Sequence, residues 1–166
     1  MPYEQALAES RRRHGTPLVP GSAPETVALD RFRAFFSTFS PDKVDRLLAA
    51  TYAPDVWFND TLKEIEGLAA LAPYLRESSE AVAACTVKID EIIANGSGDY
   101  YVRWTMMIRF KRFARGKDTH SIGISQLRFN SDGLVVFHQD FWNAADGLFQ
   151  YVPLLGAGIR AIKRRL

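Results

Sequence analysis

The stretch Leu134-Val-Val-Phe-His-Gln-Asp-Phe-Trp-Asn143 reads as a strand that starts in the core and ends among polar residues. Its first half is apolar, and its second half sets an acid between two aromatic rings. Because side chains alternate across a strand, His138, Asp140 and Trp142 share one face. If that face lines a cavity, a carboxylate lies among rings with a histidine beside it. Such a site suits acid–base chemistry.

Composition indicates one domain without a nucleic-acid partner. The chain has 166 residues, of which 47% are hydrophobic and 24% charged, as in ordinary globular proteins. The net charge is +2, and residues 23–143 carry 14 basic against 16 acidic residues, because much of the basic charge lies near the ends. A nucleic-acid-binding domain would have a basic body.

The sequence offers no sign of a disulfide framework, a membrane span or a bound cofactor. Its single cysteine, Cys85, fits a reducing compartment, so we expect a cytoplasmic protein. No apolar run approaches the roughly 20 residues that span a bilayer, and no hydrophobic signal core opens the chain. No His/Cys cluster has metal-ligand spacing and no phosphate-binding glycine motif occurs, so we expect neither metal nor cofactor.

Residues 1–24 are predicted to be a flexible leader, in which Tyr3 to Arg13 could form a short helix. Glycine and proline interrupt the chain beyond it. The main domain is predicted over residues 25–150. Capping signals and helical apolar spacing predict three helices that begin near Ser22, Ser40 and Gly67.

Strand patterns follow the helices. A short strand is expected at Val56–Phe58, and turn signals then separate four longer candidates: Thr86–Ala94, Asp99–Phe113, Asp118–Phe129 and the stretch at 134–143. Helices followed by antiparallel strands indicate an α+β fold with the helices on one face of the sheet.

Residues 151–166 predict a C-terminal amphipathic helix, interrupted at its start by Pro153 and Gly156. Ile159, Ile162 and Leu166 would share its apolar side, and its tip is basic. We expect a lid, a dimer contact or a packing arm rather than contact with a membrane surface, because the apolar stripe is only three turns long.

The order of these elements resembles the nuclear transport factor 2-like superfamily, which includes SnoaL-like polyketide cyclases, ketosteroid isomerases and limonene epoxide hydrolase. The resemblance is carried by Tyr52–Asp60, Gly67–Leu71, Ser125–Asn130 and His138–Trp142. It implies a cone-shaped, curved antiparallel sheet with three N-terminal helices on its concave face. It also implies a homodimer and a small apolar ligand or substrate.

Ketosteroid isomerases imply one set of roles. Their general base corresponds to Asp60, but the Tyr and Asp of their oxyanion hole correspond to Phe36 and Ser125. The hole is therefore missing, and steroid isomerisation is disfavoured.

Limonene epoxide hydrolase implies another set. Its first catalytic Asp corresponds to Asp140, its Arg to Arg103, and its water-holding Tyr and Asn to Trp57 and Asn59. Its second Asp corresponds to Thr105, which cannot serve as an acid. Half of that machinery is present.

SnoaL-like cyclases require little of the protein besides a base on the last strand, and that base corresponds to Asp140. We therefore expect a cofactor-independent acid–base enzyme of cyclase, isomerase or hydrolase type on an apolar cyclic or polyketide-like substrate. Asp140 would be the base, assisted by His138, Asp60 and Arg103. The expected pocket lining is Trp57, Asn59, Trp142, Phe36, Ser125 and Tyr74. A non-catalytic hydrophobic-ligand-binding module and a homo-oligomeric adaptor with a filled cone are the alternatives.

The direction of Arg103 stays open at this level. Alternation places it with Tyr101 and Thr105 on the more polar face of its strand, which favours solvent. The resemblance turns it toward the pocket instead.

Overall fold

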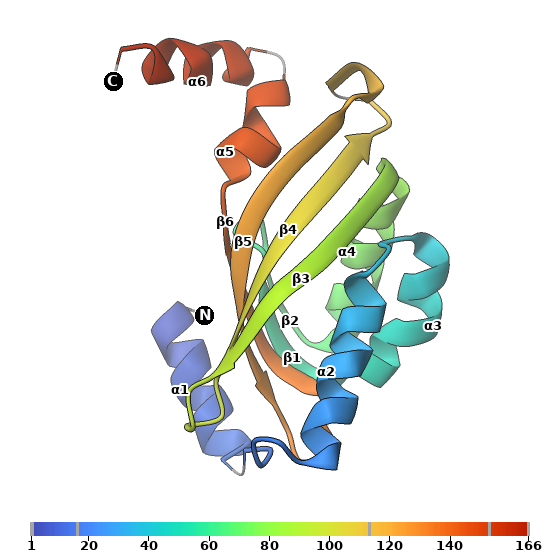
Figure 1. The fold of residues 1–166 in the computed structure, drawn as a ribbon, viewed down its shortest axis with the longest axis vertical. Coiled ribbons are helices and arrows are strands. Elements are labelled where there is room, and N and C mark those ends of the chain that lie inside the picture. The colour runs from blue at the N-terminus through green and yellow to red at the C-terminus, as the bar shows by residue number, and fades with distance from the viewer. Residues whose placement is uncertain (1, 16, 113, 153, 166) are drawn as a thin grey trace.

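A computed structural model describes residues 2–15, 17–112, 114–152 and 154–165. Figure 1 shows a strongly curved sheet with helices on its concave side and one helix on its outer side. The α-helices are α1 (Tyr3–Arg13), α2 (Ala23–Phe36), α3 (Pro41–Thr51), α4 (Leu68–Glu80), α5 (Ala144–Gly147) and α6 (Leu155–Lys163). Short 3₁₀ turns occur at η1 (Ala114–Gly116) and η2 (Phe149–Tyr151).

The sheet has the strand order β2-β1-β6-β5-β4-β3. Its neighbours pair antiparallel, apart from β1 and β6, which run parallel within the described residues. Register shifts in β3 and at the β1–β6 and β5–β6 pairs add the local twist that bulges bring to a curved sheet. The strands are β1 (Tyr52–Asn59), β2 (Glu64–Glu66), β3 (Val82–Ala94), β4 (Tyr100–Phe110), β5 (Asp118–Phe129) and β6 (Val135–Trp142).

Two of the predicted helix starts are confirmed by their caps. The Ser22 hydroxyl accepts a hydrogen bond from the backbone N–H of Glu25, and Ser40 accepts one from Lys43. Each serine precedes a proline in the first helical turn, where the missing N–H costs nothing. These local signals therefore determine where α2 and α3 begin.

The main core lies between the concave face of the sheet and helices α2, α3 and α4, as predicted (Figure 1). Phe35 from α2 and Leu71 from α4 are completely buried there, as are Val102 and Leu127 from the central strands. Burying such side chains gains roughly 1.5–3 kcal/mol each, so this layer supplies much of the folding free energy.

Helix α1 packs on the opposite face of the sheet. Its Ala6 and Leu7 form a separate buried cluster with Trp57 of β1 and Phe137 of β6. The predicted helix at Tyr3–Arg13 is thus present. It makes apolar contacts with the sheet, because the outward-facing aromatic residues of β1 and β6 give it a surface to cover.

Several element limits differ from the sequence-based expectation. Strand β1 begins at Tyr52 rather than Val56, and strand β3 begins at Val82 rather than Thr86. Strand β2 and helix α5 were not predicted, since three- and four-residue elements are too short to show a period. The expected strand end at Phe113, the break at Pro153 and the apolar position Leu166 lie outside the described residues.

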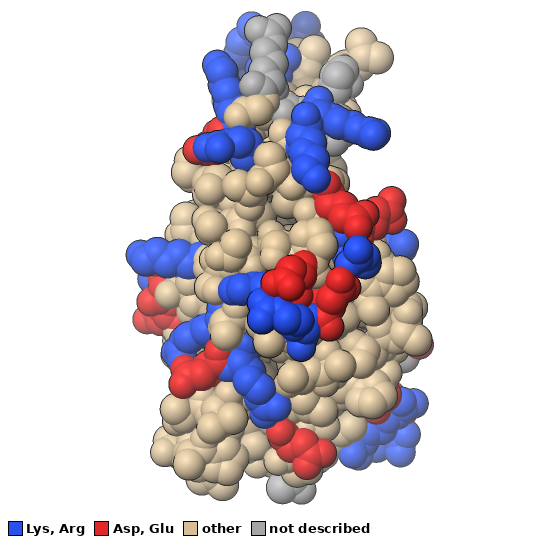
Figure 2. Space-filling view, turned by 90° about the vertical axis from the view of Figure 1, so that its right-hand side faces the viewer, with Lys and Arg blue, Asp and Glu red and all other residues tan. Residues whose placement is uncertain are grey.

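Charge on the helical side of the molecule is mixed. Figure 2 shows acidic and basic side chains interspersed across the middle of this face, with no single field of one sign there. Within the described ranges, no helix has both the length and the apolar character that crossing a bilayer requires.

Candidate functional site

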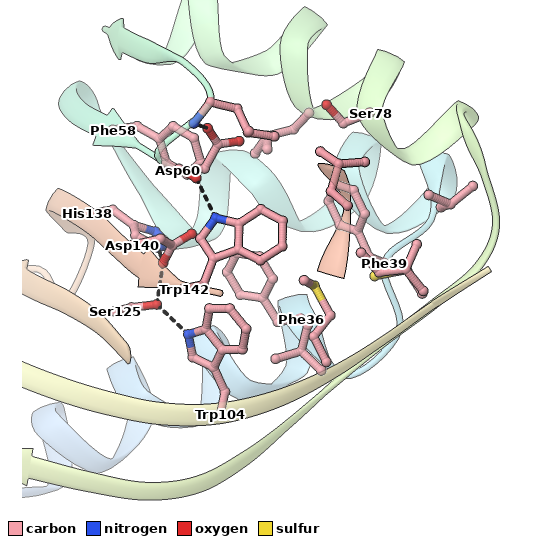
Figure 3. A pocket seen from close by; sticks show the side chains of 18 of the residues that line it. Phe36, Phe39, Phe58, Asp60, Ser78, Trp104, Ser125, His138, Asp140 and Trp142 are labelled. Carbon is pink, nitrogen blue, oxygen red and sulfur yellow. Dashed lines mark hydrogen bonds and ion pairs between the residues drawn. The ribbon is translucent and has the colours of Figure 1, made fainter. Parts of the chain in front are cut away.

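A cavity of about 270 Å³ lies between helices α2 and α4 and the concave face of the sheet (Figure 3). Its volume is close to the lower end of the roughly 300–1,000 Å³ range of small-molecule sites. Most of its wall is apolar, and the rings on that wall are Phe32, Phe36, Phe39, Phe58, Tyr74, Trp104, Phe110 and Trp142.

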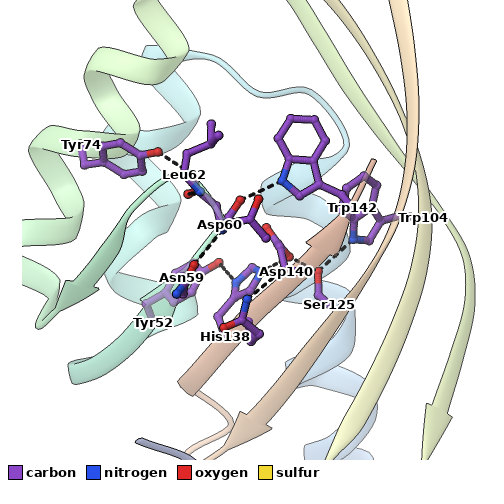
Figure 4. Close-up of polar contacts among 12 residues, drawn as sticks. Tyr52, Asn59, Asp60, Leu62, Tyr74, Trp104, Ser125, His138, Asp140 and Trp142 are labelled. Atoms are coloured by element: carbon purple, nitrogen blue, oxygen red, sulfur yellow. Dashed lines mark hydrogen bonds and ion pairs between the residues drawn. The ribbon is translucent and has the colours of Figure 1, made fainter. Parts of the chain in front are cut away.

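The polar groups gather at one end of this cavity, where β5 and β6 meet the end of β1 (Figure 4). Asp140 lies at the centre of the group, and its side chain is 17% exposed. It points into the cavity together with His138 and Trp142, because the three alternate with Gln139 and Phe141 along β6. The cavity is therefore apolar along most of its length and polar at this end.

Ser125 holds one oxygen of the Asp140 carboxylate. Its hydroxyl lies 2.5 Å from Oδ1 of Asp140 and 2.9 Å from the indole nitrogen of Trp104. An indole N–H can only donate, so the Ser125 oxygen accepts from Trp104 and its own proton points to Asp140. Trp104 thereby sets the direction of the whole arrangement.

His138 holds the same oxygen from the other side. Its Nε2 lies 2.7 Å from Oδ1 of Asp140, and its Nδ1 lies 2.8 Å from the Tyr52 hydroxyl (Figure 4). Complete burial, followed by the charge of Asp140, raises the pKa of Tyr52 well above its usual range, so the hydroxyl keeps its proton and donates to Nδ1. A neutral imidazole then carries its proton on Nε2 and donates it to the carboxylate.

Both donors reach Oδ1, and in the described part of the chain no hydrogen bond reaches Oδ2 of Asp140. Two hydrogen bonds directed at one oxygen fix the rotation of the carboxylate. The arrangement therefore leaves Oδ2 able to accept a hydrogen bond from a ligand in the cavity.

Asp60 also lines the cavity, but its carboxylate organises the turn after β1. Its Oδ1 accepts from the backbone N–H groups of Leu62 and Lys63 at 2.9 Å, and its Oδ2 accepts from the Tyr74 hydroxyl at 2.5 Å. Burial, followed by Asp60, raises the pKa of Tyr74, so Tyr74 stays protonated. The indole of Trp142 donates to the Asp60 carbonyl at 2.8 Å. The geometry assigns Asp60 to this turn.

Trp57 and Asn59 do not line the cavity, contrary to what the resemblance implied. Alternation along β1 directs Phe58 inward and its two neighbours outward. Trp57 stacks on Phe137 at 4.8 Å between ring centroids, beneath α1. Asn59 accepts a hydrogen bond from the backbone N–H of Thr61 at 2.7 Å and so caps the turn.

The resemblance placed Arg103 in the pocket, whereas strand alternation favoured the outer face, and the structure has it on the outer face. It lies on the outer face of β4, where it pairs with Asp90 and Glu91 at 3.5 and 3.3 Å. Its side chain is 53% exposed. Thr105, the position of the missing second acid, faces the same way and donates to Asp90 at 2.8 Å. Neither residue can act on a ligand in the cavity.

The other expected lining residues, Phe36, Ser125, Tyr74 and Trp142, all lie on the cavity wall. Sequence reasoning missed the hydrogen-bonding roles of Tyr52 and Trp104. A signal existed for each, because a buried tyrosine or tryptophan needs a partner for its polar atom. The partner itself lies 86 residues away for Tyr52 and 21 for Trp104, and no local pattern reveals such pairs.

Gly123 allows the two cavity tryptophans to pack together. It pairs with Trp104 on β4 and with Trp142 on β6. A Cβ atom at this position would lie 2.4 Å from the Trp104 ring and 2.8 Å from Cβ of Trp142. The glycine therefore makes room for the indole that orients Ser125.

Among the described residues, no three His, Cys, Asp or Glu side chains lie together as a metal site would need. The pocket cysteine, Cys85, is a thiol: burial raises its pKa to about 12. The described polar groups thus support proton chemistry centred on Asp140.

Comparison with solved structures identifies the fold. A limonene epoxide hydrolase-like epoxide hydrolase from Mycobacterium tuberculosis is 18% identical, with a TM-score of 0.61, covering 89% of this chain and 100% of that one. A putative SnoaL-like polyketide cyclase from Jannaschia sp. is 14% identical, with a TM-score of 0.59 and coverage of 76% and 92%. A second Mycobacterium tuberculosis protein, in complex with estradiol-17β-hemisuccinate, is 18% identical, with a TM-score of 0.58 and coverage of 75% and 98%.

At these identities the likeness concerns the fold alone. No curated protein matches the chain. Residues 30–138, more than half of the chain, match the SnoaL-like domain family. The chain therefore belongs to the SnoaL-like domain family, and its fold is that of the nuclear transport factor 2-like proteins.

Proposed function

We propose that this protein is a cofactor-independent acid–base enzyme that acts on a small apolar substrate, with Oδ2 of Asp140 as the general base. The observation that carries the proposal is the convergence of Ser125 and His138 on the other oxygen of the same carboxylate. That convergence leaves one oxygen directed at the cavity and fixes its position, as general-base catalysis requires.

The surroundings of Asp140 support this role. An apolar wall excludes water from a bound substrate and strengthens electrostatic interactions with the carboxylate. His138 and Ser125 act as positioning residues, because they hold the carboxylate. Tyr52 and Trp104 hold those two residues in turn.

Two reaction types implied by the wider superfamily lose support. Epoxide opening of the limonene type needs an arginine between two acids, and Arg103 lies on the outer face of the sheet. Steroid isomerisation needs two oxyanion donors, and the corresponding cavity positions hold Phe36 and Ser125, whose hydroxyl already donates to Asp140. Isomerase or cyclase chemistry that begins with proton removal remains the proposal.

The proposal is tested by hydrogen exchange on a generic carbon acid. The probe is 2-tetralone, whose C1 protons exchange slowly with D₂O and are followed by proton NMR. The protein should accelerate this exchange above the buffer rate, and Asp140→Asn should remove the acceleration. Asp132→Asn, in the exposed turn before β6, is the matched control.

A binding protein without turnover is the second candidate, and the closed Tyr52–His138–Asp140 network also suits it, because a rigid acceptor can orient a ligand. It predicts ligand binding with no exchange of 2-tetralone at any protein concentration. An adaptor with a filled cone is disfavoured by the cavity volume of about 270 Å³.

A homodimer and a cytoplasmic location remain part of the proposal. Exposed apolar side chains on the outer face of the sheet, Ile122, Ile124 and Phe141, support a contact between copies. Sedimentation of the wild type and of Ile122→Lys would measure the oligomeric state. We expect a wild-type dimer that the substitution dissociates, and a monomer in both cases would contradict the proposed homodimer.

A further inference from the structure

The described residues at the polar end of the cavity include two carboxylates and no lysine or arginine. In this part of the chain Asp140 accepts from Ser125 and His138, and Asp60 accepts from two backbone N–H groups and Tyr74, so no lysine or arginine is among the donors. No described lining residue is a lysine or an arginine.

Several other acids of the protein pair with arginine. The buried carboxylate of Asp99 pairs with two arginines, and Asp118 on the surface pairs with Arg109 in a two-pronged contact. A lysine does stand near the cavity, but Lys63 lies over the Tyr74 ring, 5.0 Å from its centroid, and is not part of the lining. The negative charge of the cavity wall is thus left uncompensated by the described residues that line it.

A ligand that fills the cavity removes water from Asp140, and a carboxylate with no lysine or arginine partner loses much of its solvation free energy in that step. A cationic ligand group offsets the loss, whereas an anionic group adds repulsion to it. The walls around Asp140 suit a cation as well, since the faces of aromatic rings attract ammonium groups. Trp142, Trp104 and Phe58 supply such rings at this end (Figure 3).

We propose that the cavity selects small apolar ligands that carry one positive charge, amines or iminium compounds, and discriminates against carboxylates and phosphates. This inference rests on the proposed role of Asp140 and names the class of substrate. Proton transfer from such a substrate balances simply: the N–H or C–H proton moves to Oδ2, the electron pair of that bond stays on the substrate, and both charges disappear.

Three probes of similar size test the selectivity: benzylamine, benzyl alcohol and benzoate at pH 7. Binding is followed by proton–nitrogen NMR of the indole groups, because Trp104 and Trp142 line the cavity while Trp57 lies under α1 and serves as an internal control. A hydrogen bond to a charged group contributes more free energy than a neutral one. We therefore expect benzylamine to bind about 10-fold more tightly than benzyl alcohol, and benzoate to bind most weakly.

In Asp140→Asn the preference for benzylamine over benzyl alcohol should fall below about 3-fold, while benzyl alcohol affinity changes little. Asp132→Asn should keep the wild-type ratio. Three results with the wild-type protein would overturn the inference, even if the variant failed to fold. These are equal affinities for benzylamine and benzyl alcohol, tighter binding of benzoate than of benzylamine, and no change in the Trp104 and Trp142 signals with any probe. Retained ammonium preference without 2-tetralone exchange would refute the enzyme proposal alone, and exchange without the preference would refute this inference alone.

Discussion

Ser125 and Asp140 lie directly opposite each other on the neighbouring strands β5 and β6, and the serine hydroxyl donates to Oδ1 of the aspartate at 2.5 Å. The pairing is set by the register of the sheet, so the backbone itself brings the two side chains together. Trp104, from the next strand, then fixes the direction of the serine proton. Three adjacent strands thus cooperate in orienting one carboxylate.

Ser125→Ala should destabilise the protein by about 1–3 kcal/mol, because the buried indole N–H of Trp104 loses its acceptor. The free energy of unfolding in urea measures the effect. Ser131→Ala, in the exposed turn before β6, should stay within about 0.5 kcal/mol of the wild type. Equal effects of the two substitutions would contradict the role given to the Trp104–Ser125 hydrogen bond.

Gly123→Ala should displace the Trp104 ring, because the new Cβ would lie 2.4 Å from it. Overpacking of this kind costs roughly 1–3 kcal/mol. Gly158→Ala is the matched control: it lies in α6 with no atom within 4 Å of the added methyl group, so it should stabilise the helix by up to about 1 kcal/mol. Gly123→Ala should lower the midpoint temperature of thermal unfolding and Gly158→Ala should raise it. A shift in the same direction for both variants would contradict the packing of Gly123 against Trp104.

Tyr52→Phe should release the tautomer of His138. In the wild type, nitrogen NMR of the imidazole should show a proton on Nε2 and none on Nδ1, because Nδ1 accepts from the Tyr52 hydroxyl. Without that hydroxyl the two tautomers should mix. Tyr100→Phe removes a buried hydroxyl that donates to Glu25 instead and should leave the His138 signals unchanged. A wild-type proton on Nδ1 would exclude the assignment.

Asp99 predicts how stability depends on pH. Burial alone would raise its pKa, but hydrogen bonds from Arg128, Arg11 and Asn95 lower it overall. A folded pKa below the unfolded value means that Asp99 stabilises fully above about pH 3.9 and that this contribution disappears as pH falls through the folded pKa.

Asp99→Asn should therefore be less stable than the wild type at pH 7, and the difference should shrink as the pH falls below about 4. Urea midpoints at pH 7, 5 and 3 measure the difference, and Asp132→Asn should show none of this trend. A gap that widens in acid would mean that the pKa of Asp99 is raised on folding rather than lowered.

Alternation and capping predicted much of the fold and the face of the central strand. His138, Asp140 and Trp142 point into the cavity together because residues two apart on a strand lie on the same face. The same rule placed Arg103 outside, against the resemblance to limonene epoxide hydrolase. Alternation also explains why Trp57 faces α1, since Phe58 occupies the inward position.

The hydrogen-bond partners of the site could not be predicted from local sequence. Tyr52 meets His138 only because β1 lies parallel to β6, and a parallel pairing of distant strands leaves no periodic signal. The packing of α1 escaped prediction for a similar reason: its surface consists of Trp57 and Phe137, which come from different strands.

Deuterium exchange of 2-tetralone tests the central claim most directly, when the wild type, Asp140→Asn and Arg103→Gln are compared at equal concentration. A positioned general base contributes at least about 100-fold, so Asp140→Asn should lose that factor, while Arg103→Gln on the outer face should keep the wild-type rate. A folded Asp140→Asn protein that exchanges 2-tetralone as fast as the wild type would contradict the assignment of Asp140 as the base.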